Sequence, residues 1–296
     1  MKKFTIGSDV EFFAHNGKKF ISAIPFIGDD VDGTKHNPIV FADESTLQRD
    51  NVAAEFATAV AKNRSEFVHV MKVAMGHMVT ALAGHGLTVK AIPSVSFCKE
   101  QLNHWEAMEF GCDPDFNAWE NGAVNCKPCA VNKSLRTAAL HVHVGSPLLR
   151  SKKNKQRFIR LMDCVHGITS TMMDTSPASL ARKELYGKAG AYRPTKYGVE
   201  YRVLSNYFAS SPRFIKIIYD LTKDALAIME REDDEKLVHE LGGKAGVCDV
   251  INSGNSSLAQ LYFMRVVSRF LNVETSNYIM DNKNYNPKSL KEEWDV

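Results

Sequence analysis

Four short stretches of the chain place ionic side chains at every second position, with apolar residues between them. A period of two is the side-chain period of a β-strand, so each stretch can direct its ionic groups to one face and its apolar groups to the other. The ionic residues are Asp9, Glu11, Glu55, His141, His143, Glu200 and Arg202. If the four strands share one sheet, one face is a hydrophobic core, and the other has the composition of a divalent-metal and phosphate site.

The segments between these stretches predict an α+β fold. Apolar residues at three- and four-residue steps predict helices over residues 65–83, 152–174, 211–232 and 256–272. Period-two patterns predict strands over residues 3–13, 51–58, 87–97, 137–145 and 197–205. We therefore expect a single domain over residues 1–296, with a mainly antiparallel sheet and helices packed on its apolar face. The part from 207 to 296 is expected to be helical and to end in a polar tail.

Length and charge narrow the class of protein. The chain has 296 residues, of which 44% are hydrophobic and 24% charged, as in an ordinary globular protein. Its formal net charge of +3 gives no reason to expect nucleic acid as a partner. No stretch approaches the roughly 20 apolar residues of a membrane span, and the N-terminus lacks the apolar run of a signal peptide. We expect a cytoplasmic protein without a membrane partner.

The six cysteines are spaced irregularly in a chain too long to need disulfides, so we expect reduced thiols. Cys126-Lys-Pro-Cys129, with Cys98 and Cys112 upstream, is an alternative zinc site. Structural zinc usually takes two close ligand pairs, and only one is present. A loop with reduced cysteines that covers a substrate is therefore the preferred interpretation of residues 98–136.

The spacing of the first acidic pair favours metal binding. Asp9 and Glu11 lie on one face of their strand, with Cα atoms roughly 6–7 Å apart. Two carboxylates this close raise the pKa of at least one of them, and a divalent cation such as Mg²⁺ or Mn²⁺ removes the conflict. The simpler alternatives are a solvated edge strand for this pair and a cross-strand ion pair for Glu200 and Arg202. Asp43, Glu44 and Asp50 precede the second strand and could also reach the site, but they are interpreted as solvated turn residues.

The order of the motifs resembles a known family. The chain carries Gly7-Ser8-Asp9-x-Glu11, a strand with Glu55, His141-x-His143-Val144-Gly145, and Tyr197-Gly198-x-Glu200-Tyr201-Arg202. This order is similar to that of the carboxylate–amine ligases of the glutamine synthetase and glutamate–cysteine ligase superfamily, above all the compact phage-encoded branch called COOH–NH2 ligases. The resemblance runs from about residue 5 to residue 206. A phage-encoded member would act in the host cytoplasm.

The resemblance implies a fold, a reaction and a set of residue roles. The fold is the glutamine-synthetase-like catalytic sheet, and the reaction is ATP-dependent formation of an amide or peptide-like bond through an acyl phosphate, with Mg²⁺ or Mn²⁺. The implied metal ligands are Asp9, Glu11, Glu55, His141 and Glu200. The implied catalytic and nucleotide-binding residues, which contact phosphates, are His143, Arg193 and Arg202. Asp9 stands where many relatives have Glu, which retracts that ligand by about one methylene.

Several points stay open at this stage. The partners are small-molecule or peptide carboxylates and amines of unknown identity, and the state of assembly is open because some superfamily members form rings. The base that deprotonates the amine is not identified, with Asp113 and Asp115 as the candidates. A nuclease or phosphohydrolase would use the same residue types, and a non-catalytic phage accessory or binding protein on the same scaffold is a further alternative.

Overall fold

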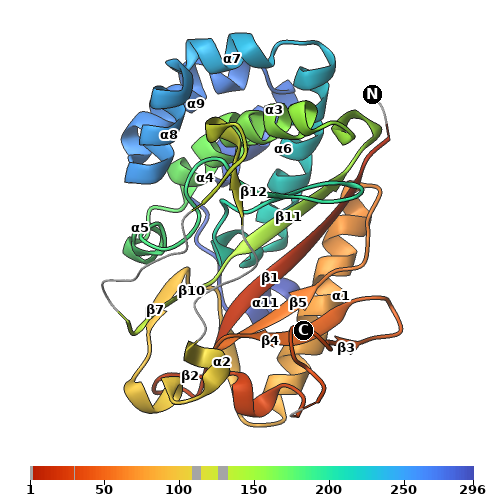
Figure 1. Ribbon diagram of the computed structural model, residues 1–296, viewed down its shortest axis with the longest axis vertical. Helices are drawn as coiled ribbons and strands as arrows, with labels where there is room; N and C mark the ends of the chain where they lie inside the picture. The colour runs from red at the N-terminus through yellow and green to blue at the C-terminus, as the bar shows by residue number, and fades with distance from the viewer. Residues whose placement is uncertain (1–2, 30, 109–114, 126–132) are drawn as a thin grey trace.

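A computed structural model describes residues 3–29, 31–108, 115–125 and 133–296 of the protein. At its centre runs the long strand β1 (Thr5–His15), which pairs with β5 (Ala53–Ala57) on one side and β11 (Leu140–Gly145) on the other (Figure 1). Strand β13 (Gly198–Tyr201) pairs in turn with β11. The four strands predicted to carry ionic side chains are therefore neighbours in one sheet.

Shorter strands extend this sheet in the order β3-β4-β5-β1-β11-β13-β12-β8-β9, while β2 and β6 pair with the far end of β1. All described pairings are antiparallel, as predicted. The bounds are β2 (Phe20–Ile21), β3 (Ile39–Val40), β4 (Thr46–Asp50), β6 (Thr88–Lys90), β8 (Phe116–Asn117), β9 (Ala123–Val124) and β12 (Ala191–Pro194).

The single strand expected over residues 87–97 is in fact two. Its first part is β6, and its second part, β7 (Ser94–Ser96), forms a separate two-stranded sheet with β10 (Leu135–Thr137). Pro93 lies directly before β7. A proline has no backbone N–H to donate to a ladder, so strands commonly end or change direction there.

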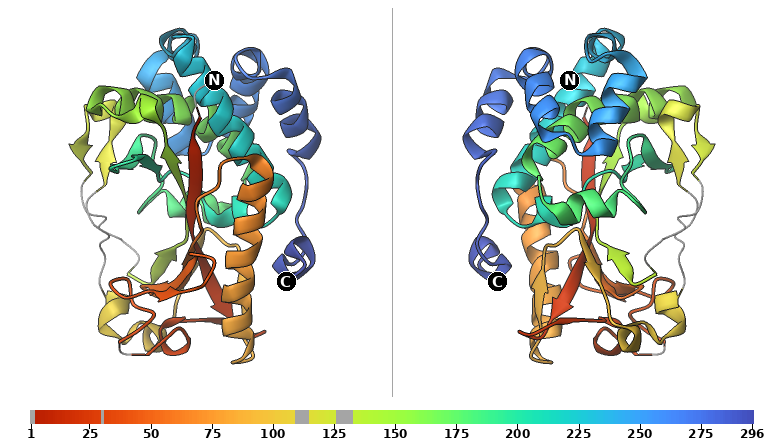
Figure 2. Two further views of the ribbon diagram at one scale, coloured as in Figure 1. Left: turned by 90° about the vertical axis from the view of Figure 1, so that its right-hand side faces the viewer. Right: turned by 90° about the vertical axis from the view of Figure 1, so that its left-hand side faces the viewer.

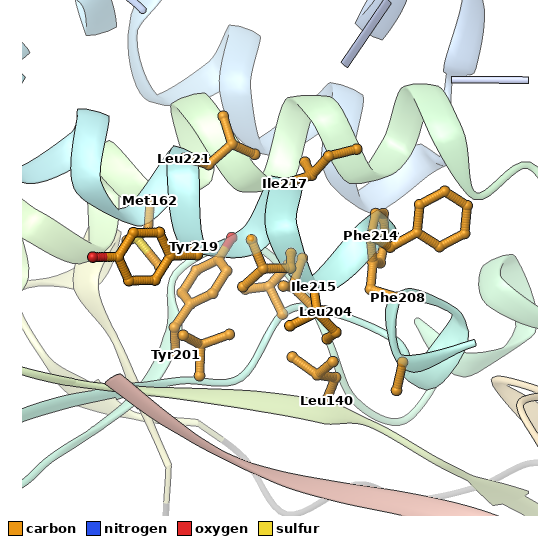
Figure 3. Close-up of a cluster of buried hydrophobic side chains, with 14 of the residues drawn as sticks. Leu140, Met162, Tyr201, Leu204, Phe208, Phe214, Ile215, Ile217, Tyr219 and Leu221 are labelled. Atoms are coloured by element: carbon orange, nitrogen blue, oxygen red, sulfur yellow. The ribbon is translucent and has the colours of Figure 1, made fainter. Parts of the chain in front are cut away.

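The apolar side chains of the alternating strands form the core. Ile6, Val10 and Phe12 of β1, Val142 of β11 and Val199 of β13 are all nearly inaccessible to solvent. Figure 3 shows Leu140 and Tyr201 of this face directed at side chains of α6 (Pro212–Glu230), among them Ile215 and Tyr219. Burying one such side chain contributes roughly 1.5–3 kcal/mol, so a register slip that exposed this face would be costly.

The long helices pack on this apolar face, as predicted (Figure 2), whereas the short α2 (Trp105–Met108) lies on the opposite side of the sheet, near Glu11. α1 (Arg64–Ala83) begins at Asn63, whose side chain accepts a hydrogen bond from the Glu66 N–H. The helix expected over 152–174 consists of α3 (Lys152–Met162), a π-helical turn (Asp163–Gly167) and α4 (Ile168–Met173). Among the described residues, no helix has both the length and the apolar character that a membrane span requires.

The C-terminal part contains more helix than the sequence indicated. Besides α6 and α9 (Ser256–Arg265), the chain forms α7 (Asp234–Glu240), α8 (Gly243–Ser253), α10 (Val273–Asn282) and α11 (Leu290–Trp294). The expected polar tail is wrong, because Trp294 is buried and its indole N–H donates to the Ala209 carbonyl. Asp234, at the start of α7, is also buried and pairs with Arg157.

Candidate active site

The strand register brings the predicted ionic residues together on the face opposite the core. Asp9 lies across from His141, Glu11 across from Glu55, and His143 across from Glu200. Arg193 on β12 lies across from Glu200 on its other side. Glu11, Glu55, His141, Glu200 and Arg202 each expose less than a tenth of their surface. This much buried charge requires compensation by partners or ions.

Two groups of side chains on this face are close enough to share a cation. Ligand atoms of Asp9, Glu55 and His141 lie within 4.8 Å of one another, and so do those of Glu11, Asp50 and Glu55. The first group includes an imidazole, which suits Mn²⁺ as well as Mg²⁺, whereas the second consists of carboxylates, which suit Mg²⁺. Glu55 belongs to both groups. The predicted ligand Glu200 belongs to neither group in the described part of the chain.

The pKa values of these groups reflect crowding of like charges in a buried place. Burial, followed by the nearby Asp50 carboxylate, raises the pKa of Glu11 to about 7. Burial, Asp50 and Glu11 together raise the pKa of Glu55 well above its ordinary value. Burial and the Arg202 guanidinium hold the pKa of His141 well below its ordinary value, so its ring is neutral, which is the metal-binding form. This donor set therefore fits divalent cations, which would relieve the repulsion between the carboxylates.

Imidazole and guanidinium groups occupy the other end of the ionic face. His143 Nε2 lies 2.9 Å from Asp9 Oδ2, and its Nδ1 lies 2.6 Å from the Tyr197 hydroxyl. Although burial opposes it, the charge of Asp9 raises the pKa of His143, and His143 in turn lowers that of Asp9. Arg202 Nη1 donates to Glu200 Oε1, and Arg193 Nη1 lies 3.7 Å from the same oxygen.

The pair formed by Glu200 and Arg202 is the ion pair that the sequence left open as an alternative, although both residues lie on the same stretch of chain rather than across two strands. Arg202 also lies 3.3 Å from His141 Nδ1. The negative charge of Glu200 is already compensated by two arginines. In this structure, Glu200 therefore holds the two guanidinium groups in position. The role of metal ligand that the resemblance implied for it stays a prediction.

A cavity of about 150 Å³ opens beside the carboxylate-rich end of this face. Its lining includes Glu11, Asp50 and Arg202, together with the side chains of Trp105 and Tyr186. A cavity of this size holds a ligand of only a few heavy atoms, such as benzene. The candidate metal groups are therefore in contact with a space in which a small part of a substrate fits.

Arg182 forms part of the wall of this cavity and was not predicted from the sequence. Its guanidinium is buried and donates to the carbonyls of Val203, at 2.9 Å, and Arg202, at 3.4 Å. Burial lowers its pKa to about 10. Gly187 makes room for it, because a Cβ there would lie 1.8 Å from Arg182 Nη1, and its φ of +76° is also unfavourable for other residues. Arg182 thus fixes the backbone that carries Arg202.

Asp163 supports the same strand from the core side. It lies in the π-helical turn, is fully buried, and accepts hydrogen bonds from Tyr201 Oη at 2.8 Å and Trp119 Nε1 at 2.6 Å. Burial raises its pKa to about 7 in spite of these donors. Tyr201 lies between Glu200 and Arg202 in the sequence. Because Asp163 accepts hydrogen bonds from both Tyr201 and Trp119, it connects the site to the segment that contains Trp119. π-Helical turns occur frequently near functional sites.

The interpretation of one acidic residue changes. Asp50, interpreted as a solvated turn residue, ends β4 and lies with Glu11 and Glu55. The sequence contains a sign of this position, because Gln48 and Asp50 are two residues apart and so point to the same face of the sheet as Glu55. The Gln48 side chain donates a hydrogen bond to the Glu55 carboxylate at 2.7 Å. Asp43 and Glu44 do lie in a turn. Asp113 and the cysteines 112, 126 and 129 lie outside the described residues, and the described cysteines 98, 164 and 248 are free thiols.

Comparison with known proteins confirms the family resemblance. Residues 138–245 match the family described as phage phiEco32-like COOH.NH2 ligase-type 2. This segment is less than half of the chain and contains His141, His143, Arg193, Glu200 and Arg202, but not the acidic residues of β1 and β5. No curated protein sequence matches the chain.

Several solved structures are similar to the chain at low sequence identity. A glutamine synthetase from Plasmodium falciparum has a TM-score of 0.41 and 10% identity, covering 76% of this chain and 52% of that one. A bifunctional glutathione synthetase from Pasteurella multocida has a TM-score of 0.44 and 8% identity, covering 95% and 51%. A glutamine synthase homologue has a TM-score of 0.42 and 9% identity, covering 95% and 70%. The chain spans about half the length of the first two.

Proposed function

We propose that this protein is an ATP-dependent, ADP-forming ligase that joins a carboxylate to an amine through an acyl phosphate. The observation that carries the proposal is the pair of cation-binding groups that share Glu55 and lie next to Arg193 and Arg202 on one sheet face. The family match of residues 138–245 supports carboxylate–amine ligation over other uses of such a face. The names of the similar structures, glutamine synthetase and glutathione synthetase, are consistent with it.

In the proposed reaction, one set of side chains on and beside β1 binds metal ions and another contacts phosphate. In this proposal Asp9, Glu55 and His141 hold one divalent cation and Glu11, Asp50 and Glu55 the other, with Mg²⁺ or Mn²⁺ as the ions. Such ions bring phosphate oxygens and a carboxylate together and offset their charge. Arg193, Arg202 and His143 contact the phosphoryl group during transfer, since cationic groups there stabilise charge on its equatorial oxygens. The substrate carboxylate occupies the cavity beside Glu11. Its oxygen attacks the γ-phosphorus of ATP, the bond from that phosphorus to the bridging oxygen breaks, and ADP leaves.

The proposal is tested by the requirements for ADP release. We expect purified protein to release ADP from ATP only when Mg²⁺ or Mn²⁺ and a carboxylic acid are present, and to form an amide when an amine is added. A panel of small carboxylic acids with hydroxylamine as the amine identifies the acid, because any acyl phosphate is trapped as a hydroxamate, which forms a coloured complex when iron(III) is added. The proposal would be refuted if the rate of ADP release did not depend on the acid or the amine, or if the protein cleaved nucleic acid without ATP.

A non-catalytic scaffold protein makes a different prediction. Such a protein need not bind nucleotide or metal, so titration calorimetry with Mn²⁺ and with a non-hydrolysable ATP analogue separates the two. We expect binding of both, with the nucleotide binding more tightly when metal is present. A protein that binds neither would retain the fold without the chemistry.

A further inference from the structure

The proposed reaction needs a base, because an amine in water near neutral pH carries an extra proton and cannot attack a carbonyl carbon. The base must be a side chain that reaches the acyl group from the side on which the amine arrives. The acyl group lies near Arg202 in the proposed function, on which this inference rests. Such a base is expected to be a carboxylate between Arg202 and a space large enough for an amine.

A second cavity lies on the other side of the loop that contains Tyr186 and Gly187. Its volume is about 510 Å³, within the range of ligand pockets, and Trp119, Glu120, Glu184 and Lys244 contribute to its lining. The two cavities share four described lining residues, namely Asp115, Leu185, Tyr186 and Gly187. Asp115 is the carboxylate among these four.

The position of Asp115 is fixed by the sheet that carries the rest of the site. It directly precedes β8, which pairs with β12, the strand that carries Arg193. Its carbonyl accepts a hydrogen bond from the Asn125 N–H at 2.9 Å. Asp115 Oδ2 lies 3.9 Å from Arg202 Nε, and its side chain retains 18% of its surface exposure. A carboxylate thus stands beside the phosphate-binding arginine and remains accessible from both cavities.

The charges of the second cavity suit a cationic ligand. Its described lining carries the carboxylates of Asp115, Glu120 and Glu184 against the ammonium groups of Lys188 and Lys244. Glu120 and Lys244 pair with each other. The first cavity, in contrast, holds the candidate metal groups, to which an anionic substrate is drawn. The two cavities therefore differ in the charge of the ligand that they favour.

We propose that the amine substrate enters through the second cavity and that Asp115 is the catalytic base that accepts its proton. The ammonium nitrogen gives one proton to the Asp115 carboxylate, and the neutral nitrogen then attacks the acyl carbon. The bond between that carbon and the phosphate oxygen breaks as the C–N bond forms. A second proton leaves the nitrogen with the departing phosphate. One acyl phosphate dianion and one ammonium ion thus yield amide, HPO₄²⁻ and protonated Asp115.

The experiment compares two nucleophiles that differ in their need for a base. Ammonium must lose a proton before it attacks, whereas hydroxylamine is mostly neutral near pH 7 and attacks directly. General-base catalysis contributes typically about 100- to 10,000-fold, so Asp115→Asn is expected to lower ammonium-dependent amide formation by at least about 100-fold. Hydroxamate formation with the same acid and ATP should remain near the wild-type rate. Asp115→Glu should restore part of the ammonium reaction.

Matched variants separate this role from a structural one. Asp249→Asn changes an exposed carboxylate of α8, outside the described lining of both cavities, and should leave both reactions unchanged. If Asp115→Asn lowers both reactions equally, Asp115 acts only by holding Arg202, and the proposal is overturned. If it lowers neither, another group is the base. If the wild-type protein forms no hydroxamate with any acid, the proposed function itself fails, and this inference fails with it.

Discussion

The replacement of Asp163 by asparagine measures how much the ionisation of one buried carboxyl behind the site changes the free energy of unfolding. The pKa of Asp163 is raised to about 7 from 3.8, because the carboxyl is fully buried and only neutral donors reach it. A carboxyl whose pKa is raised in the folded state lowers the stability of the protein once the pH rises above the pKa of that carboxyl in the unfolded chain. The loss of stability reaches its full size when the pH exceeds the pKa in the folded protein. Asp163→Asn removes this dependence.

The expected magnitude follows from the two pKa values. With one pH unit worth about 1.4 kcal/mol, ionisation of Asp163 costs the folded state about 2 kcal/mol at pH 5 and about 4 kcal/mol at pH 8. The hydrogen bonds that asparagine makes less well with Tyr201 or Trp119 add a penalty that does not change with pH. The stability of the variant relative to wild type should therefore improve by about 2–3 kcal/mol between pH 5 and pH 8.

The assay is urea unfolding of both proteins at the two pH values, with EDTA present so that bound metal does not contribute. Asp249→Asn is the control, because Asp249 is exposed on α8 and its substitution should have the same small effect at both values. The fluorescence of Trp119, whose indole N–H donates to Asp163, gives a local reading of the same titration in the folded protein. An equal effect of Asp163→Asn at pH 5 and pH 8 would refute the reasoning.

Three further predictions concern the ionic face. Glu11→Gln keeps an oxygen for the Ala139 N–H, so it should fold normally but lose metal-dependent ADP release; near wild-type turnover would show that Glu11 is not a ligand. Arg202→Lys should lose most ADP release, because lysine does not reproduce a bidentate phosphate contact, and unchanged kinetics would remove Arg202 from the site. Gly187→Ala should lower stability by about 1–3 kcal/mol through its positive φ and its clash with Arg182, as read by thermal unfolding, and a stable variant would contradict the close approach.

The arrangement of the ionic face was predictable because its signal is local. Alternation in β1, β5, β11 and β13 determines which side chains share a face, and it does so without knowledge of distant contacts. The same alternation places Gln48 and Asp50 beside Glu55, but only once the hairpin of β4 and β5 is known to have a two-residue turn. Asp50 was missed because its role depends on that register.

Other parts depend on contacts between distant segments. Arg182 reaches the site from α5 (Pro177–Arg182), some twenty residues before the strand that it supports, and no local pattern marks it. The π-helical turn that buries Asp163 has no periodic signature. α7, α8, α10 and α11 are short, and helices shorter than about 12 residues owe their stability mainly to packing rather than to their own sequence. The position of Arg182, the π-helical turn and the short helices thus depend on tertiary contacts, which the local sequence pattern does not contain.

The central claim, that the protein activates a carboxylate by phosphorylation, is tested most directly by following one oxygen atom. The acid is prepared with isotopically labelled carboxylate oxygens and incubated with ATP, Mg²⁺, an amine and the protein, and the released phosphate is examined by mass spectrometry. An acyl phosphate intermediate transfers one labelled oxygen to phosphate in every turnover. The account predicts labelled phosphate in proportion to amide, and unlabelled phosphate, with its oxygen taken from water, would contradict it.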